Sequence, residues 1–378
     1  MSDVPPLRFP EFTEEWKAEQ LDNIATLSKG IGISKEQLSE DGEPCILYGE
    51  LYTKYKSEII KQVESKTDIN GSKLKRSKAN DVIIPCSGET AVDIATARCV
   101  PFDNILFGGD LNVISLHQYD GAFMSYQLNG KRKYDIARVA QGVSIVHLYG
   151  EHLKAIKTYN PTLPEQQKIA KLLSLLDDRI DTQNKIIEDL KLLKSAISLN
   201  VLHSDTWEQF KIKDIAQIGR GRVISSIEIS QQKSPTYPVY SSQTSNDGIM
   251  GYLDDYMFEG EYISWTTDGA NAGTVFYRNG KFNCTNVCGL LKLIKGFDTH
   301  FVSLVLAEAT KEYVSINLAN PKLMNNTMGN IQIRLPKLEE QKRISIVFRV
   351  LQRLWTIHNS LLTEYIKQKQ YLLSQMFI

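Results

Sequence analysis

Two related stretches of sequence decide the fold. The first is Pro161-Thr-Leu-Pro-Glu-Gln-Gln-Lys-Ile169, followed by an apolar-periodic run to about Val201. The second is Pro336-Lys-Leu-Glu-Glu-Gln-Lys-Arg-Ile344, which lies 175 residues later (336 − 161) and continues the match without a gap to the C-terminus. An internal repeat of this length constrains the whole architecture, so the remaining sequence is interpreted around it.

Each copy predicts one long helix. Proline precedes the helix start, glutamate stands in the first turn where the helix dipole favours it, and apolar residues recur at alternating steps of four and three. The first apolar seam consists of Ile169, Leu173, Leu176, Ile180, Gln183, Ile187, Leu190, Lys194, Ile197 and Val201. The second consists of Ile344, Phe348, Leu351, Trp355, His358, Leu362, Tyr365, Lys369, Leu372 and Met376. A period of 3.5 residues held for about five heptads is typical of a coiled coil.

Polar residues interrupt both seams at equivalent positions, which favours pairing of the two helices with each other. Gln183 matches His358, and Lys194 matches Lys369. Polar seam residues reduce stability but fix register and partner. The alternative is that each helix buries its apolar stripe against a globular domain.

Antiparallel pairing about a pseudo-twofold axis gives a specific register. It places Lys369 beside Leu176, where the neighbouring Asp177 can take its charge, and Lys194 beside Leu351 and Gln352. The two ends of the paired helices are therefore expected to differ. The second seam is also the more aromatic, and Trp355 and Tyr365 are expected to carry much of the aromatic burial.

Composition indicates an ordinary globular protein of more than one domain. The chain has 378 residues, of which 42% are hydrophobic and 23% are charged. These values allow sizeable cores and two or more domains. Lys and Arg together number 44, as do Asp and Glu, so any basic surface must be local.

Cysteine usage favours a reducing compartment. The five cysteines (45, 86, 99, 284 and 288) are scattered, and no signal peptide is apparent. We therefore expect free thiols and a cytoplasmic location. Cys284 and Cys288 have neither the spacing nor the histidine partners of a zinc site, so no metal is expected. No apolar run reaches the length that spans a bilayer.

The repeat extends beyond the helices. Trp16-Lys-Ala-Glu-Gln-Leu-Asp-Asn-Ile-Ala25 is matched by Trp207-Glu-Gln-Phe-Lys-Ile-Lys-Asp-Ile-Ala216, and both lead into a short strand-like segment that ends at Gly30 or Gly221. Three weaker echoes align Pro44 with Pro238, Asp81 with Glu261, and Asn112 with Asn286. These echoes lie in short β-branched runs separated by turn residues, as expected of strands.

The predicted fold class is therefore mixed α/β. Two similar globular domains are separated by two long antiparallel helices that form a coiled coil, with a pseudo-twofold internal repeat. The expected parts are a first globular domain at 1–158, a spacer helix at 159–204, a second globular domain at 205–333 and a C-terminal spacer helix at 334–378.

Motifs for catalysis are not recognisable. Gly30-Ile-Gly32 and Gly219-Arg-Gly221 lack the further glycines, the lysine and the strand-to-helix setting of phosphate-binding loops. Asn160-Pro161-Thr162 resembles the start of an amino-methyltransferase motif but lacks the aromatic residue that stacks the target base. No nucleophile, base and orienting group can be assembled from the sequence, so we expect no enzymatic activity of this chain alone.

Local clusters of basic and aromatic residues are better candidates for function. Lys and Arg can neutralise phosphates, and single side chains can read base edges, although a charge run is often only a solvated face. The candidate DNA-binding residues are Lys29, Tyr48, Lys54, Lys73, Lys75, Arg76, Lys78, Lys131, Arg132, Arg220, Arg222, Tyr240, Arg278 and Lys281.

The two Pro-x-Leu-x-Glu-Gln starts, the long helices and the Trp16 and Trp207 segments together resemble the specificity subunit of type I restriction–modification systems. The resemblance covers essentially the whole chain, including its duplicated order. It implies two target recognition domains, each reading one half of a bipartite, asymmetric site in double-stranded DNA. It also implies helices that set the spacing, at about 34 Å between half-site centres, and dock two methyltransferase subunits.

The resemblance further implies partners and cofactors. Restriction subunits with translocase and endonuclease activity would complete the assembly, and S-adenosylmethionine, ATP and Mg would be bound by the partner subunits, with no cofactor on this chain. The residues expected in the spacer and in subunit docking are Glu165, Gln166, Leu173, Leu176, Ile180, Ile187, Glu340, Gln341, Phe348, Leu351, Trp355 and Leu362. The alternatives are a coiled-coil adaptor without a DNA role and the specificity portion of a fused methyltransferase–nuclease.

Overall fold

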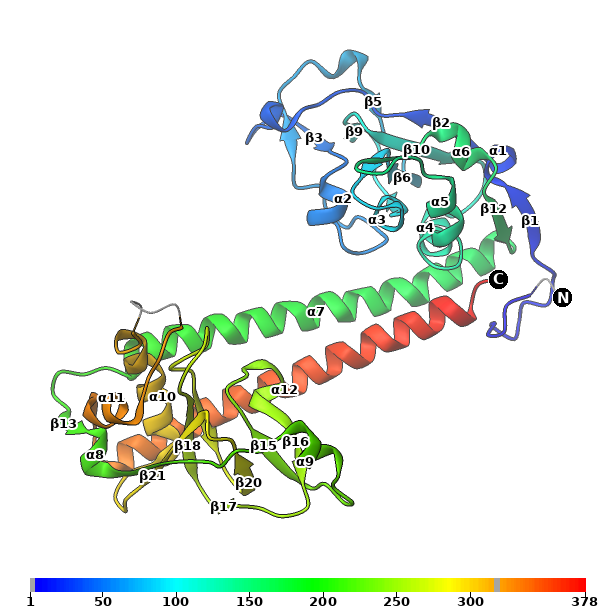
Figure 1. Ribbon diagram of the computed structural model, residues 1–378. Helices are drawn as coiled ribbons and strands as arrows, with labels where there is room; N and C mark the ends of the chain where they lie inside the picture. The colour runs from blue at the N-terminus through cyan, green and yellow to red at the C-terminus, as the bar shows by residue number, and fades with distance from the viewer. Residues whose placement is uncertain (1–3, 316–319) are drawn as a thin grey trace. The chain divides into compact units, whose positions relative to one another are not determined.

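The chain contains two compact units. A computed structural model describes residues 4–315 and 320–378 (Figure 1). The first unit comprises Met1–Lys185 and Asn359–Ile378, and the second comprises Ile186–His358. Each unit holds part of both long helices, because α7 spans Leu163–Val201 and α12 spans Leu338–Gln375. The predicted mixed α/β class and the two long helices are confirmed.

The first unit is built on two four-stranded sheets, ordered β2-β10-β6-β8 and β4-β3-β9-β5, with the pairs β1-β12 and β11-β7 beside them. Its strands are β1 Lys17–Gln20, β2 Ala25–Lys29, β3 Glu43–Ile46, β4 Lys66–Thr67, β5 Lys75–Arg76, β6 Asp81–Pro85, β7 Ser87–Gly88, β8 Arg98–Val100, β9 Leu106–Phe107, β10 Leu111–Leu116, β11 Val146–His147 and β12 Lys157–Asn160. Its shorter helices are α1 Leu21–Ile24, α2 Glu50–Thr53, α3 Ala91–Ile94, α4 Gly121–Asn129, α5 Lys133–Val139 and α6 Gly150–Lys154, with 3-10 turns η1 Lys35–Gln37 and η2 Gly71–Lys73.

The second unit repeats this plan with the sheets β14-β21-β18-β19 and β16-β15-β20-β17 and the pair β13-β22. Its strands are β13 Glu208–Lys211, β14 Ala216–Arg220, β15 Tyr237–Tyr240, β16 Ile249–Leu253, β17 Phe258–Glu259, β18 Tyr262–Thr266, β19 Val275–Arg278, β20 Lys281–Cys284, β21 Cys288–Leu293 and β22 Gln332–Leu335. Its shorter helices are α8 Ile212–Ile215, α9 Ser226–Ser230, α10 Thr299–Ala309 and α11 Asn325–Asn330, with 3-10 turns η3 Ser245–Gly248 and η4 Thr310–Glu312.

Strand registers define which residues are equivalent and correct two of the three echoes. The match of Pro44 with Pro238 is confirmed, since β3 and β15 make the same parallel pairing with β9 and β20. The other two alignments were wrong. Pairing of Val82 with Ile114 corresponds to that of Ile263 with Leu291, which shifts the Asp81 echo by one residue and the Asn112 echo by three. Such slips arise because short apolar strands fit several alignments, and only the ladder fixes register.

Gly30 and Gly221 directly follow equivalent strands, β2 and β14, for a steric reason. A Cβ at Gly30 would lie 2.0 Å from the Gly108 carbonyl oxygen, and one at Gly221 would lie 1.6 Å from the Cys284 carbonyl oxygen. Only glycine permits this close approach of two backbones. Both repeats therefore keep glycine at the point where the first strand of the sheet meets the other sheet.

Each unit has its own apolar core beside a helix capped by aspartate. Asp120 accepts the Phe123 amide at the start of α4, and Asp298 accepts the Phe301 amide at the start of α10, each at 2.7 Å. Phe123 packs with Trp16 in the first unit, and Phe301 packs with Trp207 in the second. Each tryptophan segment therefore packs against the equivalent helix of its unit.

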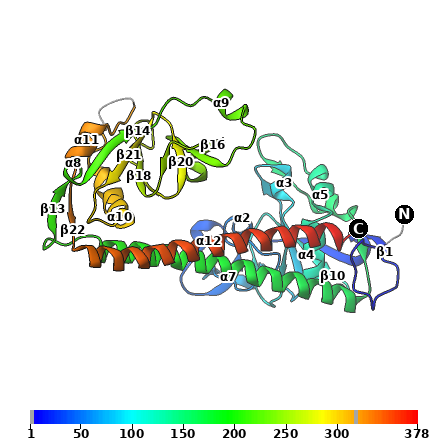
Figure 2. The ribbon, with the colours of Figure 1, turned by 90° about the horizontal axis from the view of Figure 1, so that it is seen from below.

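The long helices pair antiparallel. In the first unit the end of α12 lies beside the start of α7 (Figures 1 and 2), where Ile169 and Met376 share one apolar cluster. In the second unit the end of α7 meets the start of α12, and Val201 packs against the cluster that contains Ile344. The antiparallel pairing and its expected register are confirmed at both ends.

Burial along the seam is less complete than the sequence predicted. Phe348 and Leu351 are buried, but Trp355 is 36% exposed, and Tyr365 is only half-buried beneath the Arg179 guanidinium. The expectation that Trp355 carries much of the aromatic burial was therefore wrong. A two-helix seam without a covering globular layer leaves the outer edge of a large ring in solvent.

Candidate nucleic-acid interface and helix junctions

Equivalent strand ends bring several candidate residues to one edge of each unit. Lys29 ends β2, and Arg220 ends the matching strand β14. Lys29 lies 3.7 Å from the Asp110 carboxylate with both side chains exposed, whereas Arg220 donates to the Asn325 side chain at 2.9 Å. Tyr48 is exposed just beyond β3. This edge therefore carries a cationic side chain in both units and an exposed aromatic ring in the first.

Two other candidates of the second unit are held by carboxylates. Arg222 forms an exposed ion pair with Glu228, which raises the pKa of the arginine and lowers that of the glutamate. Arg278 is buried, pairs with Asp247 at 2.8 Å and stacks on the Tyr240 ring at 3.6 Å. Burial raises the pKa of Tyr240. Arg278 and the Tyr240 ring are thus packed into the unit, and neither guanidinium is unpaired.

The other cationic candidates fall into two groups. Some have partners within the chain: Lys54 with Glu50, Arg76 with Glu43, Arg132 with Asp135 and the terminal Ile378 carbonyl, and Lys281 with Glu259 and the Tyr256 ring. Among the described residues, no ion pair is recorded for Lys73, Lys75, Lys78 and Lys131. The lysines of the 73–78 segment are therefore the cations most available to phosphates, and the DNA-binding role of all of these residues stays a prediction.

The glutamine of each Pro-x-Leu-x-Glu-Gln start joins its long helix to its globular unit. Gln166 is buried, accepts the Asp120 amide at 2.9 Å and donates to the Pro161 carbonyl at 2.8 Å. Gln341 makes the same two bonds with Asp298 and Pro336, at 2.9 and 2.8 Å. A side chain with one donor and one acceptor group satisfies both backbone groups at once. The sequence shows the repeated glutamine, but it does not show that the glutamine contacts the start of α4 or α10.

The preceding glutamates differ between the copies. Glu165 is buried, with its carboxylate 2.7 Å from the Arg8 guanidinium, and the Trp16 indole donates to it at 3.4 Å. Glu340 is exposed. Glu165 therefore fastens the N-terminal segment to α7. Subunit docking by these glutamates and by Gln166 stays a prediction.

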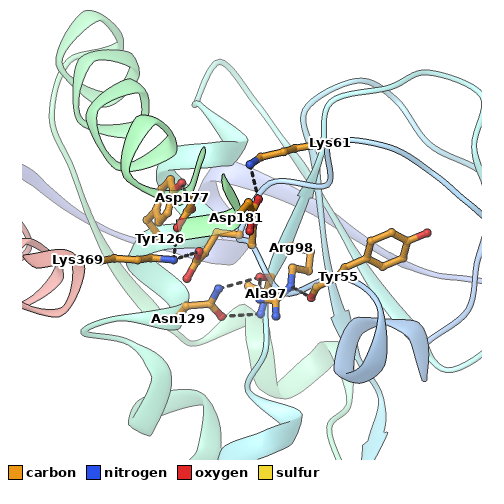
Figure 3. Close-up of polar contacts among 11 residues, drawn as sticks. Tyr55, Lys61, Ala97, Arg98, Tyr126, Asn129, Asp177, Asp181 and Lys369 are labelled. Atoms are coloured by element: carbon orange, nitrogen blue, oxygen red, sulfur yellow. Dashed lines mark hydrogen bonds and ion pairs between the residues drawn. The ribbon is translucent and has the colours of Figure 1, made fainter. Parts of the chain in front are cut away.

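A buried polar cluster joins α12, α7 and the globular part of the first unit (Figure 3). The Lys369 ammonium lies 2.6 Å from the Asp177 carboxylate and close to that of Glu58. The Tyr126 hydroxyl donates to Asp177 at 2.6 Å. Side-chain exposure is 16% for Lys369, 10% for Glu58 and 4% for Asp177. The predicted Lys369–Asp177 pairing is confirmed, and Glu58 is a partner that the seam pattern could not reveal.

Burial governs the proton affinities of this cluster. Burial raises the pKa of Asp177, and Lys369 opposes that rise. For Lys369, burial disfavours the charged form, but Glu58 and Asp177 outweigh it and raise the lysine pKa. Burial also raises the pKa of Tyr126, which stays a neutral donor. Lys369 remains charged, because loss of its proton would leave the two buried carboxylates without their ion-pair partner.

The matching junction of the second unit is open. Lys194 lines a cavity of about 290 Å³ together with Leu190, Leu351, Gln352 and Trp355. Gln352 replaces the carboxylate of Asp177 at the equivalent position, so Lys194 has no recorded carboxylate partner among the described residues. The expected inequality of the two ends is confirmed.

Apolar side chains on the long helices remain exposed outside the seam. They include Leu175, Leu192, Leu193 and Leu199 of α7 and Ile346, Val347, Val350, Leu354 and Ile357 of α12. Exposed apolar patches of this kind mark interaction surfaces. Leu172 and Ile186 of α7 are half-buried.

Neither a metal site nor a membrane span is found in the described part of the chain. No group of three or more His, Cys, Asp or Glu side chains there could hold a metal ion. The five cysteines are free and buried. Across residues 4–315 and 320–378, no helix is long and apolar enough to cross a bilayer.

The sequence profile of the type I restriction modification DNA specificity domain matches residues 13–192 and again residues 204–368. The chain belongs to this family. The two matches coincide with the two copies of the repeat, each a globular part followed by most of its long helix.

Two similar proteins are named as type I specificity subunits. The chain is 38% identical over 197 residues to S.MpnORF201P, named a type I specificity subunit, from Mycoplasma pneumoniae, covering 51% of this chain and 82% of the relative. It is 42% identical over 149 residues to the specificity subunit of the type I restriction enzyme MpnII from the same organism, covering 39% and 44%.

Solved structures share the fold at low sequence identity. The S subunit of a type I restriction–modification system from M. genitalium matches with a TM-score of 0.74 at 17% identity, covering 99% of both chains. A second solved structure concerns complex assembly and conformational transition of the type I restriction–modification system. It matches with a TM-score of 0.51 at 15% identity, covering 98% of this chain and 99% of that chain.

Proposed function

We propose that this specificity-family chain is the DNA-reading subunit of a type I restriction–modification complex and has no catalytic activity of its own. Each unit reads one half of a bipartite, asymmetric site in double-stranded DNA. The observation that carries the proposal is the duplicated frame: the same strand ends form one edge in each unit, but the side chains displayed there differ. Two similar scaffolds with different displays suit two different half-sites.

The long helices set the gap between the half-sites and bind two methyltransferase subunits. A helix of 39 residues is about 58 Å long at about 1.5 Å per residue. The apolar side chains exposed outside the seam, such as Val350 and Leu354, supply a surface for partner helices. Restriction subunits join the same complex. S-adenosylmethionine, ATP and Mg are bound by those partners and not by this chain.

A unit exchange tests the proposal. Residues of about 20–155 are replaced by the matching segment of a relative, the chain is assembled with its modification subunits, and the methylated DNA sites are sequenced. One half of the methylated motif should change while the other half and the gap stay the same. If both halves changed, the units could not be independent readers. Methyl transfer by the isolated chain would contradict its non-catalytic role.

A further inference from the structure

The turn between β15 and β16 is longer than its hairpin requires. Antiparallel strands are usually joined by two to five residues, but Ser241–Gly248 separates Tyr240 from Ile249. The Ser241 amide donates to the Gly248 carbonyl at 2.9 Å and closes the ladder. The residues 244–247 beyond this bond are exposed and polar. Connection alone does not explain this segment.

The tip of the turn has a left-handed backbone conformation. Asn246 and Asp247 have φ of 50° and 53°, in the left-handed region, which most side chains avoid. The side-chain amides of Gln243 and Asn246 both donate to the Ile249 carbonyl from inside the turn. Asn and Asp adopt this region more readily than other side chains, and the two amide bonds fix the tip in one shape.

Buried Arg278 fixes the carboxylate at the tip. Its guanidinium is 2% exposed, donates to the Ser264 hydroxyl at 3.0 Å and to the Asp247 carboxylate at 2.8 Å, and stacks on Tyr240. The Asp247 side chain itself is 68% exposed. Arg278 therefore donates its hydrogen bonds to residues of its own unit. It neutralises Asp247, which would otherwise be repelled by DNA phosphates, and leaves the other carboxylate oxygen free to accept.

The first unit places different chemistry after the equivalent strand. β3 ends at Ile46 as β15 ends at Tyr240, since both residues close the same parallel pairing. Exposed Tyr48 follows Ile46, and buried Glu50 accepts the Leu47 amide at 2.9 Å. The first unit thus presents a phenol two residues after its strand, whereas the second unit presents an amide and a carboxylate six and seven residues after the equivalent strand.

We propose that Ser241–Gly248 is the base-reading turn of the second unit, and that Arg278 is the positioning residue that presents Asp247 to an exocyclic amino group of a base. A carboxylate accepts from the N4 amino group of cytosine in the major groove. This inference rests on the proposed function. It adds the segment, the chemistry and the positioning residue for one half of the site.

The test uses the chain assembled with its modification subunits, with methylated sites or selected random duplexes sequenced. The variants are Asp247→Ala and the double change Asn246→Gly with Asp247→Gly, which keeps the backbone shape. Preference at one or two adjacent positions in one half should fall by about 5-fold to 150-fold, as for loss of one specific base contact, and the other half should stay unchanged. The matched control is Glu308→Ala, which removes another carboxylate paired with a basic side chain of this unit and should leave both halves unchanged.

Arg278→Lys tests the positioning role, because lysine keeps the charge but not the planar fork of donors. It should weaken preference at the same position as Asp247→Ala and add nothing in the Asp247→Ala background. Unchanged preference in both Asp247 variants would overturn the inference while the proposed function stands. Equal loss in both halves would also overturn it. If the unaltered complex recognised no bipartite site, the proposed function itself would fail.

Discussion

Lys369 lies between Asp177 and Glu58 in the first unit, whereas the equivalent Lys194 of the second unit borders a cavity with Gln352. The helix frame, the heptad position and the lysine are the same. The closed junction has two carboxylates, Asp177 and Glu58, whereas the open junction has the Gln352 amide at the position of Asp177. The comparison teaches that polar seam residues which look equivalent in sequence have different energetic roles when the facing residues differ.

The largest effect is expected at the closed junction. Lys369→Ala leaves Asp177 and Glu58 buried without their ion-pair partner, and breaking a buried pair in this way costs about 3–5 kcal/mol. The matched change Lys194→Ala removes an exposed side chain and should cost about 0.5 kcal/mol or less. Denaturant unfolding of both variants measures the difference. Similar losses would mean that the two junctions are energetically alike.

The Lys369→Ala deficit should depend on pH. Burial raises the pKa of Asp177, and removal of Lys369 removes a group that opposes the rise. The folded variant then binds more protons than the unfolded chain above the ordinary Asp pKa, so its stability falls as pH rises. The deficit relative to the unaltered chain should shrink between about pH 7 and pH 4. A deficit that stayed constant over this window would show that Asp177 is not the group left unpaired.

The second unit should respond to acid through His300. Burial lowers its pKa to about 4, with Arg349 acting in the same direction. The unfolded chain then binds more protons between about pH 6.5 and 4, so stability contributed by neutral His300 is lost as pH falls through that range. The full shift corresponds to about 3 kcal/mol, and the partial exposure of His300 reduces the expected loss to the order of 1–2 kcal/mol. His300→Asn should flatten this part of the pH profile, and an unchanged profile would contradict the assignment.

Trp355→Ala should have a smaller effect than a fully buried aromatic residue. A buried ring costs about 3–5 kcal/mol on truncation, but Trp355 is 36% exposed beside the cavity. We expect about 1–2 kcal/mol of lost stability. Assembly with the modification subunits should weaken, while the base preference at each half of the site stays the same. Thermal unfolding, pull-down assembly and sequencing of methylated sites measure the three quantities.

Much of the frame could be predicted from the sequence because it depends on periodic, local signals. The heptad seams gave both helices, their antiparallel pairing and the contact of Lys369 with Asp177. The partners Glu58 and Tyr126 could not be predicted, since they come from loops and helices distant in sequence.

The candidate DNA-binding residues show the same division. Basic residues were found by composition, but only packing distinguishes exposed Lys73 from buried Arg278. The turn Ser241–Gly248 was missed because no charge or apolar period marks it. Its signal was the Asn246-Asp247-Gly248 run, which favours left-handed turn conformations.

The central claim is that one duplicated frame reads two half-sites whose gap is set by the helices. The most direct measurement inserts seven residues after Gln183 in α7 and seven after the equivalent His358 in α12, which keeps both seams in phase. Four-residue insertions at the same points serve as the out-of-phase control and should assemble poorly. Methylated sites of the assembled heptad variant are then sequenced. The account predicts a longer gap between two unchanged half-sites, and an active heptad variant that kept the original gap would contradict it.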